Sequence, residues 1–126
     1  MTKQAIASNK LAPAAGPFSA AVRSNGFIYV SGQIGQDPAT GKLVAGGVPE
    51  QTERIFANLA LVLEAADKSF ADVVRAGIYV TDIASFSSMN AVYAKHFNQP
   101  YPARTTIGVA ALPLGALVEI DLVAQD

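Results

Sequence analysis

The chain has 126 residues, a formal net charge of −1 and no cysteine, which fits a single domain over residues 1–126. This composition excludes disulfides, thiol nucleophiles and cysteine-ligated metals, and the lone histidine, His96, disfavours a zinc site or a Ser-His-Asp triad. With no positive surplus and no apolar run near the about 20 residues that cross a bilayer, we expect a cytoplasmic protein without metal, nucleic-acid or membrane partners.

A β-hairpin is predicted where "FSAAVRS" and "FIYVSGQ" flank Asn25-Gly26. Both turn residues tolerate positive φ, which a tight two-residue hairpin turn requires. The turn sets a register in which Val22 faces Tyr29 and Phe18 faces Gln33. Because side chains alternate along a strand, one face of the hairpin should carry a group of mostly small or polar residues: Phe18, Ala20, Ser31 and Gln33.

Two helices are predicted further along the chain. The first covers residues 48–67, where Pro49 and Glu50 suit the first turn. Its buried stripe should consist of Ile55, Leu59, Val62, Leu63 and Ala66. The second covers residues 84–97 and ends before "NQPYP", because proline cannot continue a helix. Its stripe should consist of Phe86, Met89, Tyr93 and Phe97.

Three more strands complete the predicted order β-β-α-β-α-β-β, with a further short strand near Ile6. The strand in "FADVVRAGIYVTD" should carry Val74, Ala76, Ile78 and Val80 on its apolar face, and the last two strands are "ARTTIGVA" and "ALVEIDLVA". We expect an α+β sandwich in which both helices cover the apolar face of a mixed or antiparallel sheet. Charged residues make up only 15% of the chain, so apolar surface should remain and favour self-association.

Arg104 is the unusual residue of "ARTTIGVA", where it alternates with Thr106 and Gly108. In the last strand the even positions are apolar, so Glu119 should lie on the uncovered face. Alternation allows Arg104 and Glu119 to share that face, with Gly108 leaving space beside them. Arg104 is then either a surface residue paired with Glu119, or a guanidinium fork that holds a carboxylate ligand while Glu119 transfers a proton.

Several segments together resemble the RidA/YjgF family of reactive-intermediate (enamine/imine) deaminases. They are "GPFSAAV", "SGQIG", "YVTD", "MNAVYAKHF" and "PARTTIGVAALPLGALVEIDLVA", and the likeness runs from Ile6 to Ala124. The resemblance implies a chorismate-mutase-like fold and a homotrimer with clefts between subunits. It further implies hydrolysis of 2-imino acids and their enamine tautomers, of the 2-aminoacrylate and 2-iminobutanoate type, to 2-keto acids and ammonia without a cofactor.

The resemblance also assigns roles to residues. Arg104 matches the arginine that holds the substrate carboxylate, and Glu119 matches the glutamate that activates water. Thr106 occupies the place whose backbone carbonyl holds that water or the departing nitrogen. Other positions match residues that line the pocket: Ser31, Gly32, Gln33, and Asn90 near the cleft. From its position on the helix stripe, Asn90 could equally be a buried hydrogen-bonding residue.

Phe18 departs from the family pattern, because the usual segment is Gly-Pro-Tyr and this chain has Gly16-Pro17-Phe18. Ala20 likewise replaces a common glutamine, and both changes bear on substrate specificity. Two alternative functions stay open. One is a non-catalytic sensor of small carboxylates, which would need Arg104 but not Glu119. The other is endoribonuclease or translation-inhibitor activity, which the acidic balance disfavours.

Overall fold

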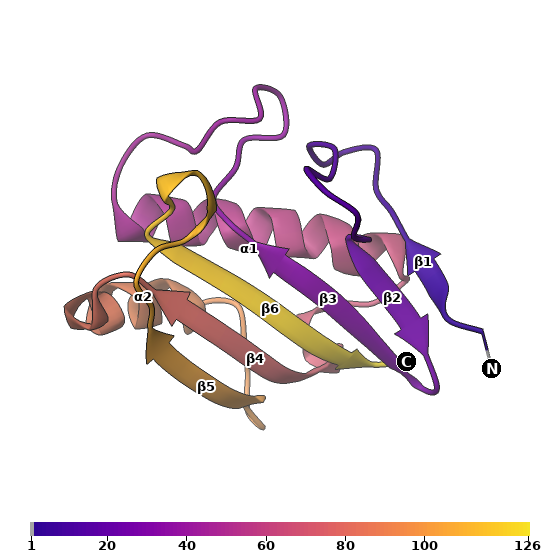
Figure 1. The fold of residues 1–126 in the computed structure, drawn as a ribbon. Coiled ribbons are helices and arrows are strands. Elements are labelled where there is room, and N and C mark those ends of the chain that lie inside the picture. Colours follow the sequence, from indigo (N-terminus) through magenta and orange to yellow (C-terminus); the bar gives the residue numbers. More distant parts are fainter. Residues whose placement is uncertain (1) are drawn as a thin grey trace.

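The computed structural model describes residues 2–126 as a six-stranded sheet with both helices on one side (Figure 1). The strand order is β1-β2-β3-β6-β4-β5, and only β4 and β5 run parallel. The elements are β1 (Gln4–Ile6), β2 (Ala21–Ser24), β3 (Phe27–Gln33), α1 (Val48–Ala65), β4 (Val73–Val80), α2 (Phe86–Tyr93), β5 (Ala103–Gly108) and β6 (Val118–Gln125), with short 3-10 turns at Phe70–Asp72, Ile83–Ser85 and Pro113–Gly115.

The predicted α+β class, element order and short first strand are confirmed. Helix α1 packs against β3 and β6, and α2 packs against α1. The other face of the sheet is not covered by a helix, and we call it the open face (Figure 1). No helix among residues 2–126 is long and apolar enough to cross a membrane.

The β2–β3 hairpin turns at Asn25 and Gly26, whose φ angles of 55° and 88° are those of a tight hairpin turn. The predicted register is confirmed at Val22, which pairs with Tyr29. The hairpin is shorter than expected, because β2 begins only at Ala21 and Phe18 lies in the loop before it. The predicted pairing of Phe18 with Gln33 is therefore absent, because the β2–β3 ladder ends at Ala21 and Val30. On the other side of β3, Gln33 pairs with Ile120 of β6 beyond an irregularity in the register.

Helix α1 begins as predicted. The Gly47 N–H donates to Glu50 Oε1 at 2.8 Å, which satisfies one of the N–H groups that a helix start leaves free. The predicted stripe is fully buried and Phe56 joins it. Each such side chain stabilises the fold by about 1.5–3 kcal/mol through removal of apolar surface from water. The buried apolar residues of α1 are Ile55, Phe56, Leu59, Val62 and Leu63.

Two residues expected in the core are exposed. Val74 is 37% exposed because the β4–β6 pairing is irregular between Val73 and Arg75, and Val73 takes the buried position instead. Phe86 is 39% exposed, whereas the rest of the predicted α2 stripe is buried. The Phe86 ring lies over Arg104 and outside the core.

Candidate functional site

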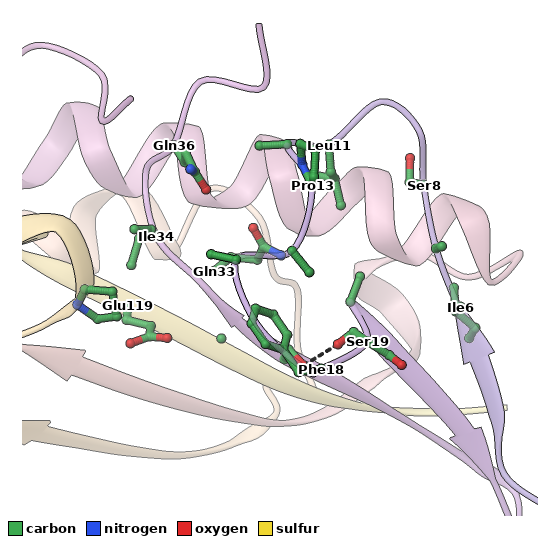
Figure 2. A pocket seen from close by; sticks show the side chains of 18 of the residues that line it. Ile6, Ser8, Leu11, Pro13, Phe18, Ser19, Gln33, Ile34, Gln36 and Glu119 are labelled. Atoms are coloured by element: carbon green, nitrogen blue, oxygen red, sulfur yellow. Dashed lines mark hydrogen bonds between the residues drawn. The ribbon is translucent and has the colours of Figure 1, made fainter. Parts of the chain in front are cut away.

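A cavity of about 850 Å³ opens where the loop between β1 and β2 meets the end of β3 and the start of β6 (Figure 2). Its walls bring together five of the predicted site residues: Phe18, Ser31, Gly32, Gln33 and Glu119. Three further predicted residues, Arg104, Thr106 and Asn90, do not line it. The candidate site is therefore divided into two parts, one at the cavity and one around Arg104.

Glu119 is the acid of the cavity. It comes from β6, lies opposite Tyr79 of β4 and lines the cavity together with Phe18 (Figure 2). Gly32 of β3 is next to its carboxylate. A Cβ atom on Gly32 would lie 2.9 Å from Glu119 Cδ and closer still to a carboxylate oxygen. The absent side chain of Gly32 therefore provides the space that the Glu119 carboxylate occupies.

The surroundings of Glu119 favour its protonated form. Partial burial raises the pKa of the Glu119 carboxyl above its ordinary value, and the negative charge of Asp121 raises it further. Asp121 accepts a hydrogen bond from the Tyr79 hydroxyl at 2.9 Å. The hydrogen bond to Asp121 and burial in turn raise the pKa of Tyr79. A carboxyl group with a raised pKa beside a cavity is suited to exchange a proton with water or substrate.

Ser31 fixes the loop that carries Phe18. The Ser31 hydroxyl donates to the Ser19 carbonyl oxygen at 2.7 Å, and the Ser31 N–H donates to the Ala20 carbonyl oxygen at 3.0 Å. These bonds hold the loop against β3, and the Phe18 ring stands at the cavity wall with 55% of its surface exposed (Figure 2). The predicted common location of Phe18, Ser31 and Gln33 is confirmed, although Phe18 reaches it from a loop.

The remaining cavity wall is largely apolar and was not predicted. It includes Leu11, Pro13, Ile34 and Leu114. Asn58 of α1 holds the loop after β3 by donating to the Gln36 carbonyl oxygen at 2.9 Å. The only sequence signal for this wall was the run of small and apolar residues "LAPAAGPF", which has no helical or strand period.

Arg104 lies on the other face of the sheet, so the predicted shared face with Glu119 is wrong. Arg104 pairs with Ala76 of β4, which pairs with Leu122 of β6, and both neighbours are buried under the helices. Glu119 pairs with Tyr79, which pairs with Ile107, on the open face. Gly108 and Thr106 share the face of Arg104.

The Arg104 guanidinium lies against α2. Its central carbon is 4.7 Å from the centre of the Tyr93 ring and 5.2 Å from that of Phe86. Burial raises the pKa of the Tyr93 phenol, and the positive charge of Arg104 partly offsets that effect. Within residues 2–126, no carboxylate oxygen lies within 4.0 Å of Arg104, so the alternative of a surface ion pair with Glu119 is wrong.

Three buried polar atoms near Arg104 have no hydrogen-bond partner within the described chain: Asn90 Oδ1, Tyr93 Oη and Thr106 Oγ1. Buried polar atoms normally have a partner, and an unpaired one costs about 1–3 kcal/mol. We call Phe86, Asn90, Tyr93, Arg104 and Thr106 the arginine cluster. An unpaired cation beside unpaired polar atoms is suited to bind an anionic ligand.

The cavity and the arginine cluster cannot form one site within a single chain. Two strand spacings of about 4.8 Å and a three-residue offset of about 10 Å separate the backbone positions of Arg104 and Glu119. Their side chains also point to opposite faces. Across residues 2–126, no group of three or more histidine, aspartate or glutamate side chains is placed to hold a metal ion.

Known proteins resemble this chain over almost its whole length. Residues 9–126 match the family described as Endoribonuclease L-PSP. A Bos taurus protein named 2-iminobutanoate/2-iminopropanoate deaminase is 43% identical over 124 residues, which is 98% of this chain and 90% of that protein. An Arabidopsis thaliana protein named Reactive Intermediate Deaminase A, chloroplastic, is 42% identical over 123 residues, which is 97% of this chain and 66% of the longer plant protein.

Solved structures with a similar fold point to the same family. The crystal structure of RidA from the Antarctic bacterium Psychrobacter sp. PAMC 21119 has a TM-score of 0.93 and 39% sequence identity, and the match covers 98% of this chain and 99% of that one. The resemblance expected from the sequence motifs is thereby confirmed. This chain belongs to the Endoribonuclease L-PSP family, also known as the RidA/YjgF family.

Proposed function

We propose that this protein is an enamine/imine deaminase that hydrolyses reactive 2-imino acids, of the 2-aminoacrylate and 2-iminobutanoate type, to 2-keto acids and ammonia. The names of its bovine and plant relatives support this activity. The observation that carries the proposal is the division of the site. Arg104 has no counter-ion among residues 2–126, and Glu119 is an acid with a raised pKa on the opposite face of the same sheet.

A homotrimer would complete the site. In the proposed assembly, the arginine cluster of one subunit faces the cavity of its neighbour, so that Arg104 and the neighbouring Glu119 hold one substrate between them. The apolar residues of the open face, Phe27, Tyr29 and Ile107, are exposed in the single chain and would be covered by the assembly. The cytoplasm is the expected compartment, although the plant relative is named as chloroplastic.

The chemistry needs orientation and one proton carrier. Arg104 binds the substrate carboxylate through two parallel hydrogen bonds, which places the imine carbon against a water molecule. Glu119 takes a proton from the water as its oxygen attacks that carbon, and it then gives the proton to the nitrogen. As the carbon–nitrogen bond breaks and ammonia leaves, Glu119 takes the proton of the new hydroxyl group, so that the carbonyl of the keto acid forms. Glu119 then passes this proton to the ammonia or to solvent water. General acid–base catalysis of this kind accelerates a reaction by about 10²–10⁴-fold.

Other residues complete the proposed site. The Thr106 backbone carbonyl accepts a hydrogen bond from the water or the departing nitrogen. In the proposed site Asn90 contributes from α2, and Ser31, Gly32 and Gln33 of the neighbouring subunit form the opposite wall. An enamine substrate first takes a proton at C3 from the same Glu119–water relay and becomes the imine. An iminium carbon is already electrophilic, so the reaction proceeds without a cofactor.

The test is keto-acid release from imines that are generated enzymatically in the assay. Arg104→Ala should reduce kcat/KM at least about 100-fold, because a misplaced substrate loses the advantage of orientation. Arg23→Ala is the matched control, since it removes a guanidinium that is paired with Asp126 at 2.8 Å and is absent from the cavity lining. Full activity of the Arg104→Ala variant would refute the proposal.

The same assay separates the alternatives. A non-catalytic sensor would bind keto acids but release none from imines, and Glu119→Gln would leave it unchanged. The family description mentions an endoribonuclease, but the net charge of −1 offers little attraction to phosphate. RNA affinity that falls steeply with salt would favour that activity instead.

A further inference from the structure

The Arg104 guanidinium lies between two aromatic rings that come from the two ends of α2. Phe86 is the first residue of α2 and Tyr93 the last, so they are seven positions apart and lie two turns apart on one side of the helix. The guanidinium carbon is 5.2 Å from the centre of the Phe86 ring and 4.7 Å from that of Tyr93. Both distances are within the range in which a ring attracts a cation.

Tyr93 is held firmly in its position. Only 6% of its surface is exposed, and its ring centre lies 4.7 Å from that of Phe97 and 5.9 Å from that of Phe56. A side chain packed in this way has one orientation, because interiors are close-packed. Tyr93 therefore provides a fixed surface for the guanidinium.

Phe86 has a different environment. It is 39% exposed, so burial in the core does not explain its large ring. Its ring is placed over Arg104, which is half-buried and has no carboxylate within 4.0 Å in the described chain. Aromatic rings attract a cation through their quadrupole but do not neutralise its charge. A carboxylate in the same place would occupy the donors that a ligand needs.

We propose that Phe86 and Tyr93 are positioning residues that hold the Arg104 guanidinium in the orientation that binds the substrate carboxylate. The inference rests on the proposed role of Arg104 as the carboxylate-binding residue. The two rings orient the guanidinium as a carboxylate partner would, but they do not occupy its hydrogen-bond donors, so these donors stay available for the substrate. Without the ring contacts Arg104 can still reach the carboxylate in the same geometry, but fewer of its orientations do so. The bound substrate and the transition state then lose binding equally, so KM should rise while kcat changes little.

Phe86→Leu is the principal variant, because Phe86 is exposed and its replacement should not prevent folding. We expect KM for the imine and the Kd for the product 2-oxobutanoate to rise about tenfold, with kcat changed less than about twofold. Phe86→Tyr keeps a ring and should match the wild type. Ile83→Ala is the control for loss of exposed apolar surface nearby, since Ile83 is 56% exposed, and it should have no effect on either constant.

Tyr93 is tested by a pair of variants. Tyr93→Phe keeps the ring and removes the hydroxyl, so it should retain the wild-type Kd for 2-oxobutanoate. Tyr93→Leu should weaken binding to a similar degree as Phe86→Leu if it folds. In the Arg104→Ala background, Phe86→Leu should have no additional effect on Kd, because the residue that it orients is already absent.

One measurement is independent of the proposed function. In the wild type, proton NMR signals of the Arg104 side chain should be shifted upfield by the two rings, and Phe86→Leu should remove much of that shift without any ligand. Absence of the shift, or an unchanged Kd and KM in Phe86→Leu, would overturn the inference even if Arg104→Ala abolishes activity. If the shift is present but the wild type neither hydrolyses imines nor binds 2-oxobutanoate, the orientation of Arg104 stands and the proposed function and the carboxylate role are wrong.

Discussion

Arg104 and Glu119 lie on opposite faces of one sheet, Arg104 beneath α2 and Glu119 on the open face. A single chain therefore cannot bring the two side chains to one substrate. The proposed function requires Glu119 as the proton carrier, Phe18 in the cavity wall and a trimer that joins the two faces.

Gly32→Ala should displace the Glu119 carboxylate, because the added Cβ would overlap it. A displacement of about 1 Å at a reacting group can reduce the rate about 100-fold, so we expect a loss of that size in kcat. Gly108→Ala is the matched control, since a Cβ there meets its nearest neighbour at an ordinary 3.8 Å. Wild-type kcat in Gly32→Ala would show that the carboxylate can act from another position.

The pH profile of kcat/KM should report the raised pKa of Glu119, which burial and then Asp121 produce. Only the ionised carboxylate can take a proton from water, so activity should fall as the pH drops through that raised value. Asp121→Asn removes a negative charge and should lower the pKa of Glu119, which moves the acid limb to lower pH. Asp67→Asn changes the net charge equally at an exposed turn and should leave the limb in place.

Phe18→Tyr should change the order in which the protein prefers imine substrates. The Phe18 ring stands at the cavity wall, and a hydroxyl there adds a polar contact beside the mostly apolar wall of Leu11 and Ile34. We expect kcat/KM ratios between polar and apolar substrates to shift by about threefold to tenfold, as one added hydrogen bond allows. An identical ranking across a panel of imines would mean that position 18 does not contact the substrate.

Ile107→Lys should dissociate the proposed trimer into monomers at micromolar concentration. Ile107 is an exposed apolar residue on the open face, beside Tyr79. A lysine buried in an interface without a partner is strongly unfavourable. Light scattering after size exclusion measures the mass, and Ala60→Lys on the exposed side of α1 is the control that should remain trimeric. A trimeric Ile107→Lys variant would place the interface elsewhere.

The sequence predicted the fold well where a local rule decides the structure. Asn25 and Gly26 determine the turn and its register, and the even positions of β6 are uniformly apolar, so its buried face was clear. In β5 both faces are mixed, with Arg104 and Thr106 on one and Thr105 and Ile107 on the other. Alternation then gives two faces without saying which one is covered. Parallel pairing with β4 decides this, and pairing between distant strands cannot be derived from alternation.

The sequence likewise predicted only some features of the candidate site. Phe18, Ser31 and Gln33 were predicted to lie together, and all three line the cavity. The register that led to this prediction does not extend to Phe18, which reaches the cavity from the loop before β2. The contact of Phe86 with Arg104 could not be foreseen, because helical period assigned Phe86 to the core. The prediction that Val74 lies in the core was wrong for a similar reason. An irregularity in strand pairing cannot be recognised from the alternation of apolar residues.

Complementation between two inactive variants tests the shared site most directly. Arg104→Ala and Glu119→Gln should each be inactive alone. In trimers assembled from an equal mixture, about a quarter of the sites should combine an intact arginine with an intact neighbouring glutamate and regain activity. A mixture as inactive as its separate components, in trimers shown by mass to contain both variants, would contradict a site shared between subunits.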